Sequence, residues 1–204
     1  MFKFKYILIV MPLLLSACQI TPKDVTSIQQ QWQIHQEDLK QINTFQVNGS
    51  IAYFSDKSRN YGRFLIIQQS VDRYGIKLTT PLGGNIFTLK VDTNYAELID
   101  RNGYRYIDNN VENLIRKISN INIPLNSLHD WLKGYSNDIA NDKLDNAGRL
   151  ISTSFMQDSK KWNVKIANYI AYSLKNRNID MPATIELTHD DERIRLKIDK
   201  WILK

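Results

Sequence analysis

The feature that most restricts the fold of this 204-residue chain is a period-two alternation of apolar and polar residues. In the last such segment, Ile194, Leu196 and Ile198 alternate with basic side chains. Successive side chains of a strand point to opposite faces of a sheet, so the pattern predicts strands with one wet face. Short polar turns join neighbouring segments, which favours one long antiparallel meander. The expected strands are Phe45–Phe54, Tyr61–Gln69, Tyr74–Thr80, Asn85–Val91, Tyr95–Asp100, Tyr104–Ile107, Leu150–Met156, Trp162–Ala167, Ala183–Thr188 and Arg193–Trp201.

Three other segments repeat apolar residues at helical spacing, within 27–42, 111–118 and 128–132. Ser27 is in position to cap the first helix, and Asn126 or Ser127 to cap the third, which Gly134 ends. A one-sided sheet has an apolar face to cover, and short helices can cover it. Periodicity alone leaves open whether these helices fill that face or leave a cavity.

The N-terminus has the three-part build of a secretory signal. Lys3 and Lys5 are followed by an apolar run, and the segment closes with Leu15-Ser16-Ala17-Cys18. That run is too short for a bilayer span, which needs about 20 residues. We therefore expect residues 1–17 to be cleaved and Cys18 to be acylated. The alternatives are an ordinary signal peptide with a chance cysteine, or a short membrane anchor that is retained.

Cys18 is the only cysteine, so it has no intramolecular disulfide partner in an oxidising compartment. In Gram-negative lipoproteins an Asp after the acylated cysteine commonly retains the protein in the inner membrane, whereas this chain has Gln19. We therefore expect export to the outer membrane. Residues 18–26 read as an acylated tether, and residues 27–204 as a single domain.

Little in the chain points to catalysis or to a cofactor. His35, His129 and His189 form no ligand pair at zinc-like spacing, and no Gly-x-Ser-x-Gly elbow or phosphate-cradling glycine pattern occurs. The net charge of +6 is spread among acids, which does not resemble a nucleic-acid-binding surface. The expectation is a protein that is not an enzyme, holds no metal or cofactor and binds no nucleic acid.

One turn calls for a functional interpretation. Pro81-Leu82-Gly83-Gly84 places a large apolar side chain between two predicted strands, where an exposed leucine forgoes about 2 kcal/mol of burial. Either Leu82 folds back onto the core as a plug, or it enters a bilayer or the apolar surface of a partner. The chemistry of the residues favours neither reading.

Ordered blocks along nearly the whole mature chain resemble the LolB family of outer-membrane lipoprotein receptors. These blocks are Trp32-x-x-His35-Gln36, Gly49–Asp56, Asp72-Arg73-Tyr74, Thr79-Thr80-Pro81-Leu82-Gly83, Ile123–Gly134, Met181-Pro182-Ala183 and Ile194–Lys204. The resemblance implies a mainly β fold: an unclosed antiparallel β-barrel of about eleven strands, with helices as a lid over an apolar cavity.

The resemblance also implies a function. Family members accept lipoproteins from the periplasmic carrier LolA and insert them into the inner leaflet of the outer membrane, without covalent chemistry. It implies a monomeric, lipid-anchored protein that faces the periplasm and contacts outer-membrane phospholipid. It assigns membrane insertion to Leu82, within the loop formed with Pro81 and Gly83.

The predicted strands and helices nominate residues for an acyl-chain cavity. They are Ile51, Phe64, Ile66, Leu78, Phe87, Leu89, Leu98, Leu114, Ile118 and Trp131. Each of them could instead belong to a dry core, because a register error of one residue reverses a whole strand. A dry interior would favour a structural or assembly lipoprotein that binds an envelope protein through its sheet edge. A lipid hydrolase is the third alternative, against which the missing nucleophile motif argues.

Overall fold

The computed structural model describes residues 27–119, 123–138, 141–157 and 159–204, so Cys18 and the tether lie outside the described residues. All described strands belong to one antiparallel sheet of order β6-β5-β4-β3-β2-β1-β11-β10-β9-β8-β7. The strands are β1 (Phe45–Phe54), β2 (Arg59–Ser70), β3 (Arg73–Thr79), β4 (Asn85–Asp92), β5 (Tyr95–Asp100), β6 (Arg105–Asp108), β7 (Lys143–Leu144), β8 (Leu150–Gln157), β9 (Lys160–Leu174), β10 (Arg177–His189) and β11 (Glu192–Leu203). The helices are α1 (Ile28–Lys40), α2 (Val111–Ser119) and α3 (Leu128–Lys133).

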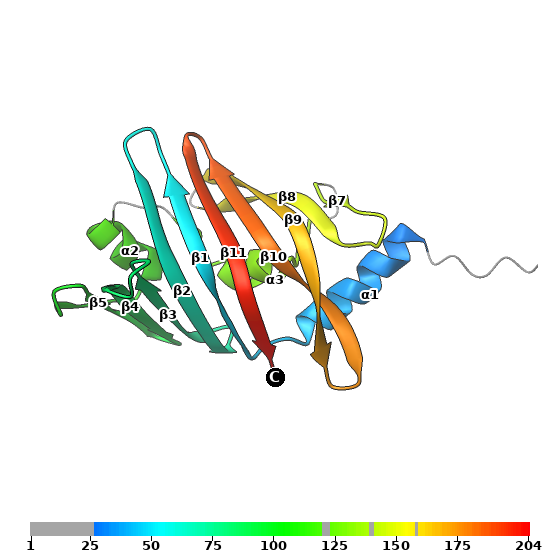
Figure 1. Ribbon diagram of the computed structural model, residues 1–204, viewed down its shortest axis with the longest axis horizontal. Helices are drawn as coiled ribbons and strands as arrows, with labels where there is room; N and C mark the ends of the chain where they lie inside the picture. The colour runs from blue at the N-terminus through cyan, green and yellow to red at the C-terminus, as the bar shows by residue number, and fades with distance from the viewer. Residues whose placement is uncertain (1–26, 120–122, 139–140, 158) are drawn as a thin grey trace, which may run out of the picture.

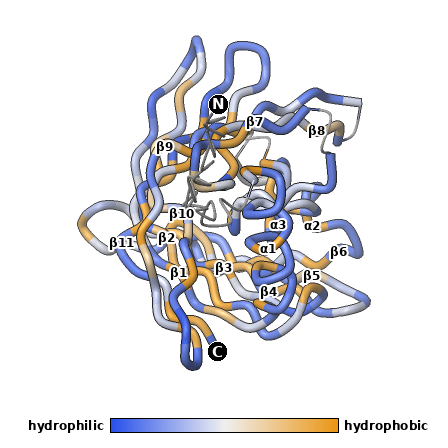
Figure 2. Tube along the Cα trace, turned by 90° about the vertical axis from the view of Figure 1, so that its right-hand side faces the viewer, coloured by the Kyte–Doolittle hydropathy of each residue, from blue (hydrophilic) through white to orange (hydrophobic). Residues whose placement is uncertain are grey.

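The sheet curves strongly but does not close, since β6 and β7 lie at its two ends and do not pair with each other. Figure 1 shows the long central strands on one side of the molecule and the helices behind them. In the view turned by 90°, α2 and α3 lie against the concave side of the sheet (Figure 2). This confirms the predicted fold class, an unclosed antiparallel sheet of eleven strands with a few short helices.

The period-two pattern becomes the two faces of the sheet. Along β11, Ile194, Leu196 and Ile198 are buried, whereas Arg195 and Lys197 are exposed. The ladder between β1 and β11 shifts by one residue at Asn48/Gly49. A Cβ at Gly49 would lie 2.2 Å from the carbonyl oxygen of Lys197, so only glycine allows the two strands to approach here.

The helix predictions hold closely. Ser27 caps α1 through a capping box, in which its hydroxyl accepts a hydrogen bond from the Gln30 amide and the Gln30 side chain accepts one from the Ser27 amide. Ser127 precedes α3 without a side-chain cap and instead donates to the Gln157 side chain. Gly134 ends α3 with φ +74°, the left-handed conformation that glycine adopts without strain.

Three strand predictions need correction. β10 begins at Arg177, not at Ala183, and it passes through Pro182 at a register shift where β11 does not pair with it. A proline is tolerated there because no ladder bond needs its missing N–H. β9 extends to Leu174 rather than ending at Ala167, and β7 was not predicted.

No helix among the described residues is both long enough and apolar enough to cross a membrane.

Candidate functional site

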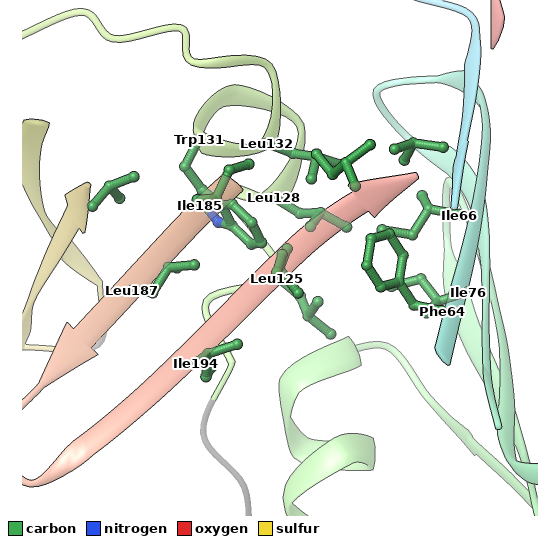
Figure 3. Close-up of a cluster of buried hydrophobic side chains, with 14 of the residues drawn as sticks. Phe64, Ile66, Ile76, Leu125, Leu128, Trp131, Leu132, Ile185, Leu187 and Ile194 are labelled. Atoms are coloured by element: carbon green, nitrogen blue, oxygen red, sulfur yellow. The ribbon is translucent and has the colours of Figure 1, made fainter. Parts of the chain in front are cut away.

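One half of the interior, around α3, is filled mainly by buried apolar side chains. Figure 3 shows Trp131 and Leu132 of α3 in the same buried cluster as Ile185 and Leu187 of β10 and Phe64 and Ile66 of β2. Leu132 and Ile185 are fully buried, and Trp131 is 3% exposed. The indole N–H of Trp131 donates to the carbonyl of Pro124 at 3.0 Å, so the polar atom of this ring is satisfied.

Lys133 ties α3 to the end of α1. Its ammonium group is buried and donates to the carbonyl oxygens of Leu39 at 3.0 Å and Ile42 at 3.1 Å. Burial lowers the pKa of Lys133 from its ordinary value, which the nearby carboxylate of Asp130 partly counteracts. Lys133 therefore donates to one carbonyl in the last turn of α1 and to one just after the helix, and the two helices are held together.

The other half of the interior contains a pocket of about 690 Å³, within the range of about 300–1,000 Å³ of ligand sites. Strands β1 to β6 and β11 form its walls, while Ile115 and Lys117 of α2 border it from the helical side. Buried or half-buried apolar side chains line the inner part, and exposed polar ones line the mouth. The apolar lining residues are Ile51, Leu78, Ile86, Phe87, Ile115, Ile123 and Ile194.

Tyr53 is the one buried tyrosine among the described lining residues, and its hydroxyl donates to the Glu192 carboxylate at 2.7 Å. Burial, followed by this hydrogen bond, raises the pKa of Tyr53 to about 12. The phenol is therefore neutral at physiological pH, and it adds no charge to the pocket.

Helix α2 is held in place by polar contacts at its N-terminal end. The Asn110 side chain accepts hydrogen bonds from the amides of Glu112 and Asn113, both at 3.0 Å. The buried carboxylate of Glu112 accepts from the Asn126 amide at 3.2 Å and from the Gln157 side chain. Lys117, near the other end, pairs with Asp108 at 3.2 Å. These contacts connect α2 to the segment before α3 and to β8.

The loop between β3 and β4 projects Leu82 into solvent. The amide of Thr80 donates to the Gly84 carbonyl at 2.8 Å, and the amide of Gly84 donates to the Thr80 hydroxyl at 3.0 Å. Gly83 has φ +93°, a conformation that residues with a Cβ rarely adopt. Leu82 is 99% exposed, so the interpretation as a turn plug is wrong.

Thr80 and Asn85, which flank this loop, both line the pocket. The loop that carries Leu82 therefore begins and ends at the mouth of the pocket.

The nominated cavity residues fall into two groups. Ile51, Leu78 and Phe87 line the pocket. Phe64, Ile66, Leu89, Leu98, Leu114 and Trp131 are buried in the packed core. Cys18 and the side chain of Ile118 lie outside the described residues. Ile115 and Ile194 also line the pocket but are not among the nominated residues, although both belong to apolar faces that the periodicity identifies.

The histidines do not assemble into a site. His35 packs edge-on against Tyr169 at 6.2 Å, and His129 lies 3.2 Å from Asp130. Burial lowers the pKa of both imidazoles. His189 lies at the β10–β11 turn beside Trp162. Within the described ranges, no three His, Cys, Asp or Glu side chains come together as a potential metal site.

A curved, unclosed antiparallel sheet with helices across its concave side and an apolar pocket defines a class of protein suited to hold an apolar ligand. A solved structure with this fold is that of a LolA superfamily protein from Nitrosomonas europaea. The similarity has a TM-score of 0.57, covers 87% of this chain and 94% of that one, and shows the fold alone, since 11% of residues are identical.

The sequence itself identifies the family. Residues 43–201 match the family model described as outer membrane lipoprotein LolB. The outer-membrane lipoprotein LolB of Serratia proteamaculans (strain 568) is 38% identical over 195 residues, covering 94% of this chain and 92% of that protein. The chain belongs to the LolB family.

Proposed function

We propose that this protein accepts acylated lipoproteins from the periplasmic carrier LolA and inserts their acyl chains into the inner leaflet of the outer membrane. Acyl groups on Cys18 anchor the processed chain to that membrane, where it faces the periplasm as a monomer. Residues 1–17 are the cleaved signal, and residues 18–26 the tether. Membership of the LolB family supports this role.

The observation that carries the proposal is the position of the exposed Leu82 beside the pocket mouth. An acyl chain in water forgoes about 0.8 kcal/mol for each methylene that a host could bury, so its transfer needs an apolar path. The pocket supplies a host, and Leu82 brings the mouth of that host to the bilayer. Transfer then requires no covalent step. It requires that the pocket bind the acyl chains more tightly than the carrier does and less tightly than the membrane does.

Loading from the carrier tests the first step. The chain from Gln19 to Lys204 includes all described strands and helices and lacks both signal and anchor. Incubated with LolA loaded with a radiolabelled lipoprotein, it should take over the label, as native gels would reveal. If the label stays on an active carrier, the protein does not receive lipoproteins, and the structural lipoprotein alternative gains support.

Delivery tests the second step. Leu82→Glu should leave loading intact but reduce delivery of the lipoprotein to liposomes at least tenfold, because a carboxylate resists entry into the apolar layer. The matched control, Leu82→Met, keeps an apolar side chain of similar volume and should deliver normally. Since Leu82 contacts solvent, neither change should alter thermal stability. Normal delivery by Leu82→Glu would remove Leu82 from the mechanism.

A further inference from the structure

Three hairpin tips stand side by side at the end of the sheet that bears Leu82. They are Ser55–Ser58 between β1 and β2, Pro81–Gly84 between β3 and β4, and Arg101–Tyr104 between β5 and β6. The sheet order β6-β5-β4-β3-β2-β1 puts the Leu82 tip between the other two. The lining of the pocket agrees with this arrangement, because it includes Tyr61, Thr80 and Arg101, which lie in or next to the three tips.

The two flanking tips and the adjoining start of β2 carry exposed cations. Lys57, Arg59 and Arg101 are exposed, and no ion pair found among the described residues includes any of them. Asp56 is the exposed acid of the first tip. In the other, the Asp100 carboxylate accepts hydrogen bonds from the amides of Asn102 and Tyr104, at 2.8 and 3.0 Å. The excess charge around Leu82 is positive.

Two tyrosines accompany these cations. Tyr61 is 58% exposed and Tyr104 is 66% exposed, each with an apolar ring and a polar hydroxyl. Tyr61 packs edge-on against Phe54, whose ring also lies 4.5 Å from the Arg193 guanidinium. Amphipathic aromatic side chains are enriched at the boundary between membrane and water, where each end finds its preferred medium.

The next hairpin along the same end has the opposite charge. Asp190 and Asp191 form the exposed tip between β10 and β11. Asp190 pairs with His189 at 3.2 Å, and Asp191 is not paired with a cation in the part of the chain that the structure describes. An anionic surface would attract the tips around Leu82 and repel this one. The end of the sheet is therefore electrostatically asymmetric.

We propose that Lys57, Arg59, Tyr61, Arg101 and Tyr104 form an interfacial rim that binds anionic glycerophospholipid head groups of the bilayer. The rim tilts the protein so that the pocket mouth faces the membrane while the β10–β11 tip stays in water. This inference rests on the proposed function, in which Leu82 enters the bilayer, and adds the lipid chemistry and the orientation. Each cation beside an anionic membrane strengthens the association about fivefold.

Spin labels can measure this orientation in the processed, acylated protein reconstituted in vesicles. With the thiol of Cys18 acylated, a single introduced cysteine can be labelled specifically, because the chain has no other cysteine. Labels are placed one at a time through Leu82→Cys, Asn102→Cys and Asp191→Cys. In vesicles of phosphatidylethanolamine with phosphatidylglycerol, power saturation with oxygen and a nickel chelate should find positions 82 and 102 immersed and position 191 in water.

Charge reversal tests the lipid chemistry. In the protein labelled at 102, Lys57→Glu combined with Arg101→Glu should increase the accessibility of the label to the nickel chelate severalfold. That accessibility should fall with rising phosphatidylglycerol content in the unchanged protein and should not depend on it in the charge-reversed variant. The matched control reverses Lys200, near the opposite end of β11, and Lys204, which follows that strand. The control should leave the label immersed.

The outcomes distinguish a failure of this inference from a failure of the proposed function. Immersion at 82 without immersion at 102 overturns the rim and leaves the proposed function standing. A water-exposed label at 82 overturns the membrane contact itself. Immersion of all three labels overturns the tilt. If charge reversal slows loading from the carrier but does not change label depth, the cations bind a protein and the lipid proposal is wrong.

Discussion

The two halves of the interior contain similar residues but are organised differently. Around α3, Trp131, Leu132 and Ile185 fill the space, and Lys133 fixes the helix to α1. Beneath α2, side chains of the same apolar kind border a pocket of about 690 Å³, and the helix is retained by hydrogen bonds at its first turn. Burial of apolar surface stabilises the first half; the second leaves part of its apolar surface available to a ligand.

This difference separates the residues that hold the fold from those that serve the site. Filling the pocket half would add stability but remove the proposed host for an acyl chain. Binding sites commonly depart from ideal packing in this way. Substitutions that loosen the packed half or fill the pocket half can test this division.

The largest effect is expected in the packed half. Leu132→Ala should reduce the free energy of unfolding by about 3–4 kcal/mol, because the side chain is fully buried and its removal leaves a cavity. Urea denaturation would measure the loss. Leu132→Met, the control, should cost less than about 1.5 kcal/mol. A loss below 1 kcal/mol for the alanine variant, by the same scale, would mean that this half is not tightly packed.

Loosening the attachment of α2 should have an intermediate effect on stability. Glu112→Ala removes the acceptor for the Asn126 amide and the Gln157 side chain, which should cost about 1–3 kcal/mol. Hydrogen exchange should accelerate in α2 and remain slow in α3, since Lys133 still holds α3. Glu112→Gln keeps one acceptor oxygen and should lie between wild type and alanine. Equal acceleration in both helices would indicate that the two halves open together.

Filling the pocket should affect binding more than stability. Leu78 is half-buried at the pocket wall, so Leu78→Trp can place its ring in open space with less strain than in a filled core. Binding of a fluorescent fatty acid should weaken at least tenfold, while Leu78→Met should bind nearly as wild type. Unchanged binding by the tryptophan variant would show that acyl chains bind elsewhere.

The smallest effect is a pH dependence in the packed half. Burial lowers the pKa of His35, an effect that Asp180 and Asp38 partly counteract. The unfolded chain then binds more protons than the fold below about pH 6.5, so this group reduces stability as pH falls through that value. Unfolding measured at about pH 7.5 and 5.5 should show a smaller loss for His35→Gln than for wild type. Equal losses would assign the acid sensitivity to other groups.

Much of the fold was predictable because burial on one face leaves a clear period in the sequence. The strand predictions were wrong where the period is interrupted. In β10, Ile179, Met181 and Ile185 keep one phase, and Pro182 obscured it although the strand continues. In β9 the ladder slips opposite Pro182, so Tyr169 falls out of phase with Ile166 and the pattern ends too early. A two-residue strand such as β7 has no period at all.

The site was predictable to a lesser degree. Residue chemistry identified Leu82 as unusual, but only the loop geometry excludes the plug. Periodicity selects inward-facing residues and cannot distinguish Leu78, at the pocket, from Leu98, in the core. That distinction depends on which helix lies opposite each strand, a long-range contact that no local pattern contains. The rim depends likewise on the order of hairpins in the sheet.

The unpaired edges at β6 and β7 have a mechanical consequence. In a closed barrel, strand number and shear together set the circumference, so the interior cannot widen without breaking ladder bonds. Here no hydrogen-bonded seam joins the two edges, and α2 and α3 lie across the concave side of the sheet (Figure 2). The sheet can flatten or curl while each strand keeps its neighbours. In the proposed function, the interior would therefore adjust its capacity to the acyl chains of each cargo with the backbone ladder intact throughout.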